Sequence, residues 1–141
     1  MSYYIDTSVL VTLLTGEIDA DRVSAWLKSV PQGKIALSEW VSTEFAAAIS
    51  VKVRMGAISA QNHADALARY SVLAGMSFGM FPVLERHFRT AAQFAGNADL
   101  GLRAGDALHL AIAASGLATV VTRDRKMASA ATALGIGVHL L

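Results

Sequence analysis

The feature that most constrains the fold is a short apolar stretch that ends in an acid near the start of the chain. Residues 3–5 favour a strand, Asp6 follows them, and a hydroxyl pair leads into an apolar run that can begin a helix. This pattern predicts a buried strand that delivers one carboxylate to a strand-to-helix junction. Asp6 is either the N-cap of that helix or a functional carboxylate, and the choice depends on whether other acids converge on it.

The remainder of the chain alternates between helix and strand patterns. The strand segments are short and continuously apolar, which favours a parallel sheet with helices on both faces. No linker divides the 141 residues, and 54% hydrophobic against 16% charged residues argues against disorder. The sequence therefore predicts one α/β domain, 1–141. The expected helices are 9–14, 19–30, 38–55, 59–74, 83–95, 106–114 and 124–134, and the later strands are 34–37, 77–81, 119–122 and 137–141.

Composition excludes several classes of site. The absence of cysteine rules out disulfides, thiolate zinc sites and cysteine nucleophiles. A net charge of +1 gives no indication for or against nucleic acid. No signal peptide is evident. The apolar segment 104–122 contains Asp106, His109 and Gly116, so it is interpreted as a buried helix, a turn and a strand rather than a membrane span. The expected location is the cytoplasm.

Four acids are expected at one edge of the sheet. Asp6 ends the first strand and Asp124 follows strand 119–122, so both lie where parallel sheets bind ligands. Glu44 lies two turns into a helix that starts from the same edge, and Asp106 lies in the first turn of the buried helix. Each has an ordinary alternative, which is an N-cap for the three aspartates and a solvated helix face for Glu44.

Clustered carboxylates repel one another and raise each other's pKa values unless positive charge balances them. Asp106 therefore pairs either with Arg103, one turn earlier, or with a cation. Mg²⁺ or Mn²⁺ takes oxygen ligands of this kind. Acids around such ions carry out phosphodiester hydrolysis, because the ion lowers the pKa of a water and stabilises the attacking and leaving oxygens.

With these residues in order, the chain resembles PIN-domain ribonucleases, and among them the VapC toxins of bacterial toxin–antitoxin pairs. No single motif is specific, but the ordered set spans nearly the whole chain. The matching stretches are Ile5-Asp6-Thr7-Ser8-Val9-Leu10, Ser38-Glu39-Trp40-Val41-Ser42-Thr43-Glu44, residues 103–111 and Val121-Thr122-Arg123-Asp124.

The resemblance implies a three-layer sandwich with a five-stranded parallel sheet between helices. It implies a metal-dependent endoribonuclease that acts as a toxin on RNA, with a VapB-like antitoxin as partner and a homodimer as its assembly. Asp6, Glu44, Asp106 and Asp124 would be the catalytic and metal-binding acids for Mg²⁺ or Mn²⁺. Polar support around them would come from Ser8, Thr122 and Arg103.

Two features have a simpler interpretation beside the functional one. His109, one turn after Asp106, is interpreted as a histidine packed on an apolar helix rather than as a general base. The first two helices carry more apolar side chains than one face needs. The apolar residues of these two helices are Val9, Leu10, Val11, Leu13, Leu14, Trp26 and Leu27. Some of them must pack on the sheet, and the remainder either form a groove for an amphipathic partner helix or belong to the core as well.

Three alternatives to the toxin remain. One is a PIN-fold nuclease without an antitoxin. Another is a phosphatase with Asp6 as nucleophile, although such enzymes place a second acid two residues later, where this chain has Ser8. The third is a non-catalytic scaffold that has kept the fold, which the presence of all four acids argues against.

Overall fold

The structure is a computed structural model that describes the backbone of residues 1–141 and every side chain except that of Met76. Helices and strands alternate along the chain, with five strands in one sheet. In order they are β1 (Tyr3–Ile5), α1 (Thr7–Thr15), α2 (Ala20–Ser29), β2 (Ile35–Ser38), α3 (Glu39–Arg54), α4 (Ala60–Met76), β3 (Gly79–Phe81), α5 (Glu85–Gly96), a 3₁₀ turn (Ala98–Leu100), α6 (Ala104–Ser115), β4 (Thr119–Thr122), α7 (Arg125–Ala133) and β5 (Val138–Leu140).

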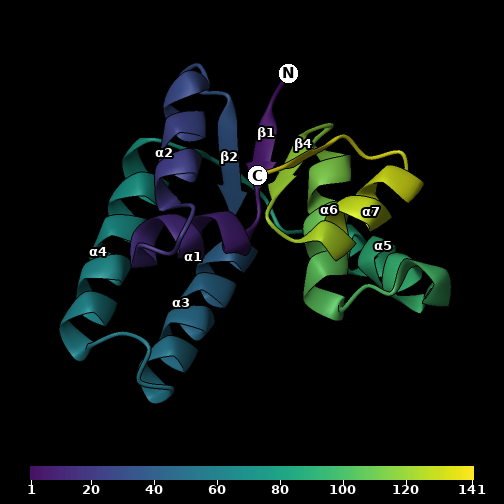
Figure 1. The fold of residues 1–141 in the computed structure, drawn as a ribbon. Helices are drawn as coiled ribbons and strands as arrows, with labels where there is room; N and C mark the ends of the chain where they lie inside the picture. Colours follow the sequence, from purple (N-terminus) through teal and green to yellow (C-terminus); the bar gives the residue numbers. More distant parts are fainter.

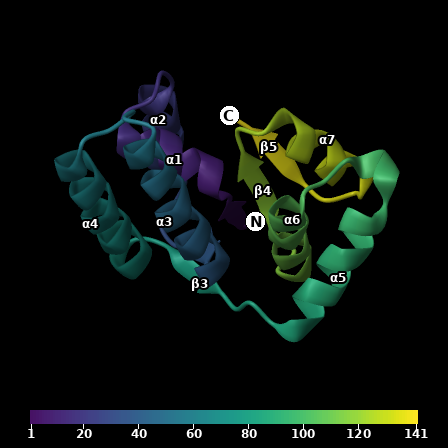
Figure 2. The same ribbon diagram turned by 90° about the horizontal axis from the view of Figure 1, so that it is seen from below.

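The sheet is parallel throughout and has the strand order β3-β2-β1-β4-β5. The chain first builds outward from β1 to β3 and then returns to the other side of β1 to add β4 and β5. Helices α1–α4 form one group and α5–α7 the other, on opposite sides of the sheet (Figures 1 and 2). The order therefore reverses between β1 and β4, and this crevice is where open α/β sheets bind ligands.

The core explains why the central strands are continuously apolar. Ile5 and Val121 are fully buried on neighbouring strands, and β2 is buried along its whole length. Phe45 of α3 is also fully buried and stacks on Tyr70 of α4, with ring centroids 4.6 Å apart. Helix α6 is buried over seven consecutive residues, 107–113. These contacts hold the ends of β1 and β4, and the helices beside them, in fixed positions.

The three-layer α/β fold with five parallel strands is confirmed, and every expected helix and strand is present within a few residues. Helix α6 begins two residues earlier than expected, with Arg103 at its N-cap position. The 3₁₀ turn was not predicted. Segment 104–122 is a helix, a turn and a strand, and none of the described helices has the length and apolarity that a membrane crossing needs.

Candidate functional site

All four predicted acids line one cavity of about 310 Å³. Asp6 comes from the end of β1, Glu44 from the second turn of α3, Asp106 from the first turn of α6, and Asp124 from the start of α7. Thr7, Ser8, Arg103 and His109 complete its polar lining. The cavity lies at the carboxyl ends of β1 and β4, where the strand order reverses. Four segments far apart in the sequence thus bring their carboxylates together.

Asp6 is the most deeply buried of the four, with 3% of its surface exposed. It occupies the N-cap position of α1, but its side chain makes no capping hydrogen bond. Its two oxygens accept instead from the hydroxyls of Ser8 (2.6 Å to Oδ1) and Thr122 (2.8 Å to Oδ2). Burial raises its pKa above the ordinary range, and these hydrogen bonds, together with His109, oppose the rise. The two hydroxyls, from α1 and β4, fix the orientation of the carboxylate.

Ser8 and Thr122 also fix the loop between β4 and α7. The backbone N–H of Arg123 donates to the Ser8 hydroxyl (3.0 Å), and that of Asp124 donates to the Thr122 hydroxyl (2.9 Å). Both predicted supports therefore tie Asp6 to the segment that carries Asp124. Asp124 does cap its helix, because its Oδ1 accepts from the backbone N–H groups of Lys126 and Met127. Its Oδ2 is directed to Arg103, with 3.8 Å between Oδ2 and Nη2.

Arg103 lies over two of the acids. Its Nε donates to Oδ2 of Asp106 (3.3 Å), so the pairing within one helical turn is present. Asp106 is not the N-cap of α6, which contradicts that alternative. Burial raises the pKa of Asp106 and the charge of Asp124 adds to the rise, whereas Arg103 lowers it. The Arg103 side chain is 82% exposed, so water screens both ion pairs and a stronger cation can displace it.

Glu44 is not the solvated helix residue that the simpler interpretation assumed, since its side chain is only 28% exposed. The hydroxyl of Thr7 donates to its Oε2 (2.7 Å), and Nε2 of His109 contacts the same oxygen. Burial by itself raises the pKa of Glu44, but the contacts with His109 and Thr7 outweigh it and leave the pKa below the ordinary value. Thr7 was not predicted as a partner, and His109 is packed on α6 as expected but also contacts Glu44.

The chemistry of the cavity suits a hard divalent cation. Its lining offers carboxylate and hydroxyl oxygens and no sulfur, and partial or full burial raises the pKa of two of its acids, Asp106 and Asp6. In these side-chain conformations no three His, Asp or Glu side chains among the described residues converge closely enough to hold one ion. Arg103 bridges Asp106 and Asp124 instead. Loading an ion therefore requires that guanidinium to move and the carboxylates to close in.

The raised pKa of Asp6 predicts a specific dependence of stability on pH. A group whose pKa is higher in the folded than in the unfolded chain stabilises the fold below the unfolded pKa of about 4, and this contribution is lost as pH rises through the folded pKa. Asp6→Asn stays neutral throughout. In EDTA, the melting temperature of Asp6→Asn should therefore rise relative to wild type as pH increases from about 4 to about 8. A difference between the two melting temperatures that is independent of pH would contradict this.

Comparison with known proteins adds a family. The sequence profile of the PIN domain matches residues 3–133. No curated protein matches.

Several solved structures share the fold. VapC20 of Mycobacterium tuberculosis, a toxin that cleaves the sarcin-ricin loop, superposes with a TM-score of 0.74 at 17% identity, covering 92% of this chain and 95% of its own. FitAcB from Neisseria gonorrhoeae superposes with a TM-score of 0.68 at 22% identity, covering 96% of this chain and 95% of the FitAcB chain. VapBC2 from Rickettsia felis, bound to a DNA fragment from its promoter, superposes with a TM-score of 0.67 at 15% identity. The match covers 99% of this chain and 98% of the VapBC2 chain. At these identities the likeness establishes the fold alone.

Proposed function

Because the chain belongs to the PIN domain family, we propose that it is a metal-dependent endoribonuclease and the toxin of a toxin–antitoxin pair. The observation that carries this proposal is the convergence of four carboxylates from four segments on one cavity at the reversal point of the sheet. The fold shared with VapC20, a toxin that cleaves the sarcin-ricin loop, supports RNA as the substrate class. Such an enzyme would act in the cytoplasm.

In this proposal Asp6, Glu44, Asp106 and Asp124 hold Mg²⁺ or Mn²⁺. When bound, the ion lowers the pKa of an attacking water and stabilises negative charge on the phosphate oxygens. Asp6 keeps its orientation because Ser8 and Thr122 donate to it. Arg103, released from the acids, is exposed enough to contact an RNA phosphate. The charge that a phosphodiester brings to the cavity is thus matched from the protein side by this guanidinium.

The function is tested with purified, partner-free protein and end-labelled RNA. We expect cleavage in Mn²⁺ or Mg²⁺, none in EDTA, and recovery when the divalent ion is added back, because the acids alone supply no positive charge to a dianionic transition state. Ca²⁺ in place of Mn²⁺ is the control, because it carries the same charge but prefers more ligands at longer distances. Cleavage that persists at full rate in EDTA would refute the proposal.

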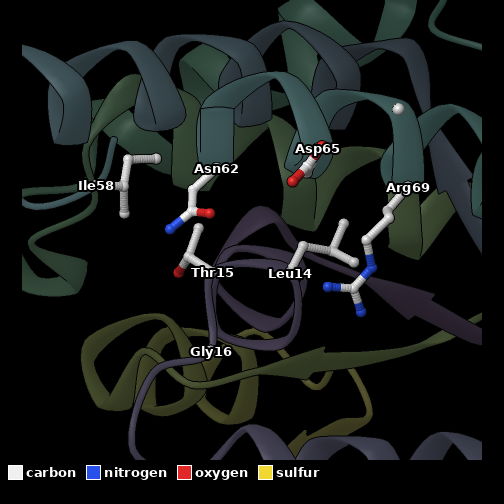
Figure 3. A pocket seen from close by; sticks show the side chains of 8 residues that line it. Leu14, Thr15, Gly16, Ile58, Asn62, Asp65 and Arg69 are labelled. Carbon is white, nitrogen blue, oxygen red and sulfur yellow. The ribbon is translucent and has the colours of Figure 1, made fainter. Parts of the chain in front are cut away.

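A groove along α1 and α4 supports an antitoxin partner. Its apolar end is a hollow of about 560 Å³ whose lining includes Leu13, Leu27 and Val72. It continues into a polar hollow of about 520 Å³, where Asn62, Asp65 and Arg69 of α4 face α1 (Figure 3). The two share Leu14, Ala68 and Arg69. An apolar floor with charged residues at one end fits an amphipathic helix.

The excess of apolar residues on the first two helices is therefore divided between core and groove. Val9 and Leu10 are fully buried, whereas Leu13 and Leu27 are only partly buried and line the apolar hollow. The sequence analysis did not include the α4 side of the groove. We propose that the antitoxin places a helix in this groove, because the groove joins an apolar floor to a polar end.

The expected homodimer stays a prediction. An apolar hollow of about 280 Å³ between α3, α5 and α6, with Trp40, Leu108 and the 55% exposed Phe88 in its lining, is the face that a second copy would cover. Sedimentation of the purified chain at the mass of a monomer would contradict this assembly.

A further inference from the structure

Glu44 differs from the other three acids in how its two oxygens are used. Oε2 accepts from the Thr7 hydroxyl at 2.7 Å and contacts Nε2 of His109. Oε1 has no hydrogen-bond partner among the described residues, which leaves it as the oxygen available to a cation. An unheld glutamate in mid-helix would sample several rotamers. The contacts at Oε2 select one of them.

His109 is itself held from behind. It is 1% exposed, and its Nδ1 lies 2.9 Å from the hydroxyl of Tyr4, which is fully buried in β1. That hydroxyl is also 2.7 Å from Oγ of Ser38, at the end of β2. Burial raises the pKa of Tyr4, so the phenol remains protonated and able to donate. The sheet therefore fixes the imidazole ring.

The direction of the chain follows from what each group can do. An ionised carboxylate only accepts, so Nε2 of His109 donates to Glu44. In the neutral ring Nδ1 then accepts, and the Tyr4 hydroxyl donates to it. Ser38 in turn donates to the oxygen of Tyr4. With a neutral His109 ring, the hydrogen bonds would run in one direction, from Ser38 through Tyr4 and His109 to Glu44.

Gly105 leaves the space that the other oxygen needs. A Cβ built at Gly105 would lie 2.5 Å from Oε1 of Glu44 and 3.4 Å from the ring of Trp40. The Trp40 indole N–H donates to the carbonyl of Gly105 (3.3 Å), which draws α3 and α6 together at this point. The backbone of Gly105 is helical, so the glycine serves close approach rather than an unusual conformation.

We propose that His109 is a positioning residue, held by Tyr4, which fixes one orientation of the Glu44 carboxylate for the cation, with Oε1 lying in the space left by Gly105. This inference rests on the proposed function, because it concerns how one of the four acids is presented to the ion. His109 is packed on the apolar helix α6 as expected, and the inference adds a role for its ring, which contacts a polar partner at each nitrogen. The sequence spacing alone gave no sign of Tyr4 as its partner.

Two replacements of His109 separate positioning from packing. The side-chain nitrogen of Asn falls near the place of Nδ1, and that of Gln near the place of Nε2. His109→Asn should therefore lose the donor to Glu44, and His109→Gln should retain one. We expect His109→Asn to weaken Mn²⁺ binding by about 10- to 100-fold, the usual effect of removing an outer partner of a metal ligand, and His109→Gln to recover most of the affinity.

The readout is the electron paramagnetic resonance signal of free Mn²⁺ during titration, with melting temperatures in EDTA measured alongside. If both variants bind Mn²⁺ as wild type does, the inference fails while the proposed function stands. If wild type itself binds no Mn²⁺, the proposed function fails and the inference with it. Long-range ¹H–¹⁵N spectra of the metal-free protein give an independent readout. We expect a His109 ring with Nε2 protonated and Nδ1 accepting, and the opposite tautomer would overturn the proposal.

A milder pair of variants protects the test against misfolding. Tyr4→Phe removes the hydroxyl that holds His109 and keeps the ring. Tyr70→Phe is the matched control, because its hydroxyl also bonds a serine (Ser42, 2.7 Å) from a largely buried position. We expect both to lower the melting temperature, and only Tyr4→Phe to weaken Mn²⁺ binding. Equal Mn²⁺ affinity in the two variants would count against the role of Tyr4.

Gly105→Ala tests the same carboxylate from its other oxygen. The added methyl would displace the end of a flexible side chain, so the protein should fold with Glu44 turned out of position. Gly75→Ala is the control, since a Cβ there meets nothing within 4 Å. We expect a loss of Mn²⁺ affinity in Gly105→Ala alone. Unchanged affinity in Gly105→Ala would show that the orientation of Glu44 does not matter for the ion.

Discussion

Replacing Asp106 or Asp6 with asparagine should lower the rate of metal-dependent RNA cleavage by about 100- to 1,000-fold, the range observed when one preorganised electrostatic partner of a transition state is removed. Asparagine keeps the shape of the side chain and removes the charge that a cation needs. Asp6 is almost fully buried, and the ion-pair partner of Asp106 is the exposed Arg103. Neither change should prevent folding, because burial raises the pKa of both acids, so the fold favours a neutral group at each position more than the unfolded chain does.

Asp21→Asn is the matched control, since Asp21 is an exposed acid in the first turn of α2 and does not line the cavity. Initial rates on one labelled RNA, at saturating Mn²⁺ and equal protein concentration, compare the three variants with wild type. Wild-type rates in Asp106→Asn and Asp6→Asn would show that the cavity is not the catalytic centre. An equal loss in Asp21→Asn would point to a general effect of charge instead.

Replacing Val72 with aspartate should weaken antitoxin binding by about 30-fold or more, which corresponds to the cost of about 2 kcal/mol or more for disrupting a central interface contact. Val72 lies on α4 in the lining of the apolar hollow and is 57% exposed without a partner. A charge there would lose its water when an apolar helix face covers it. The folded chain alone should tolerate the change, because the side chain is in solvent.

Val51→Asp controls for the substitution itself, because Val51 is also an exposed valine on a helix but lies outside the groove. The antitoxin for this test is to be sought as a small open reading frame immediately upstream of the gene for this chain, and calorimetric titration then gives the two affinities. RNA cleavage by Val72→Asp should remain, and the antitoxin should no longer inhibit it at concentrations that silence wild type. Equal affinity of Val72→Asp and Val51→Asp for the antitoxin would rule out the groove as the binding site.

The overall fold was predictable because its signals are local. Short apolar strands separated by helices already imply a parallel sheet. The positions of Asp6 and Asp124 directly after two strands placed both at the same edge. Their pairing as central neighbours became certain only with the strand order, in which β1 and β4 are adjacent. The sequence pattern carries the period and the direction of each strand but not the order in which strands assemble.

The orientation of the Glu44 carboxylate was not predictable, because it depends on side-chain directions across large sequence separations. Tyr4 and His109 are 105 residues apart, and His109 and Glu44 are 65 apart. A histidine on an apolar helix carries no local signal of its partner. The reason for a glycine at position 105 becomes visible only in the structure, where α3 approaches α6 closely. The α4 wall of the groove was missed for the same reason.

The burial of the acids also bears on the alternatives to a nuclease. A non-catalytic scaffold gains nothing from Asp6, whose burial costs free energy whenever the carboxylate is ionised. A phosphatase of this kind would need a second acid two residues after Asp6, where the chain has Ser8, whose hydroxyl donates to Asp6. A cation that binds several of the acids at once would offset the cost of burying the Asp6 carboxylate.

The most direct test of this account is anomalous diffraction from crystals of the wild-type chain soaked in Mn²⁺. The account predicts an anomalous peak in the cavity at the ends of β1 and β4, within coordination distance of carboxylate oxygens from Asp6 and Asp106, with Arg103 moved away from the acids. The same soak of Asp106→Asn crystals should lose the peak. A wild-type cavity without anomalous density at saturating Mn²⁺, with Arg103 still bridging Asp106 and Asp124, would contradict the central claim.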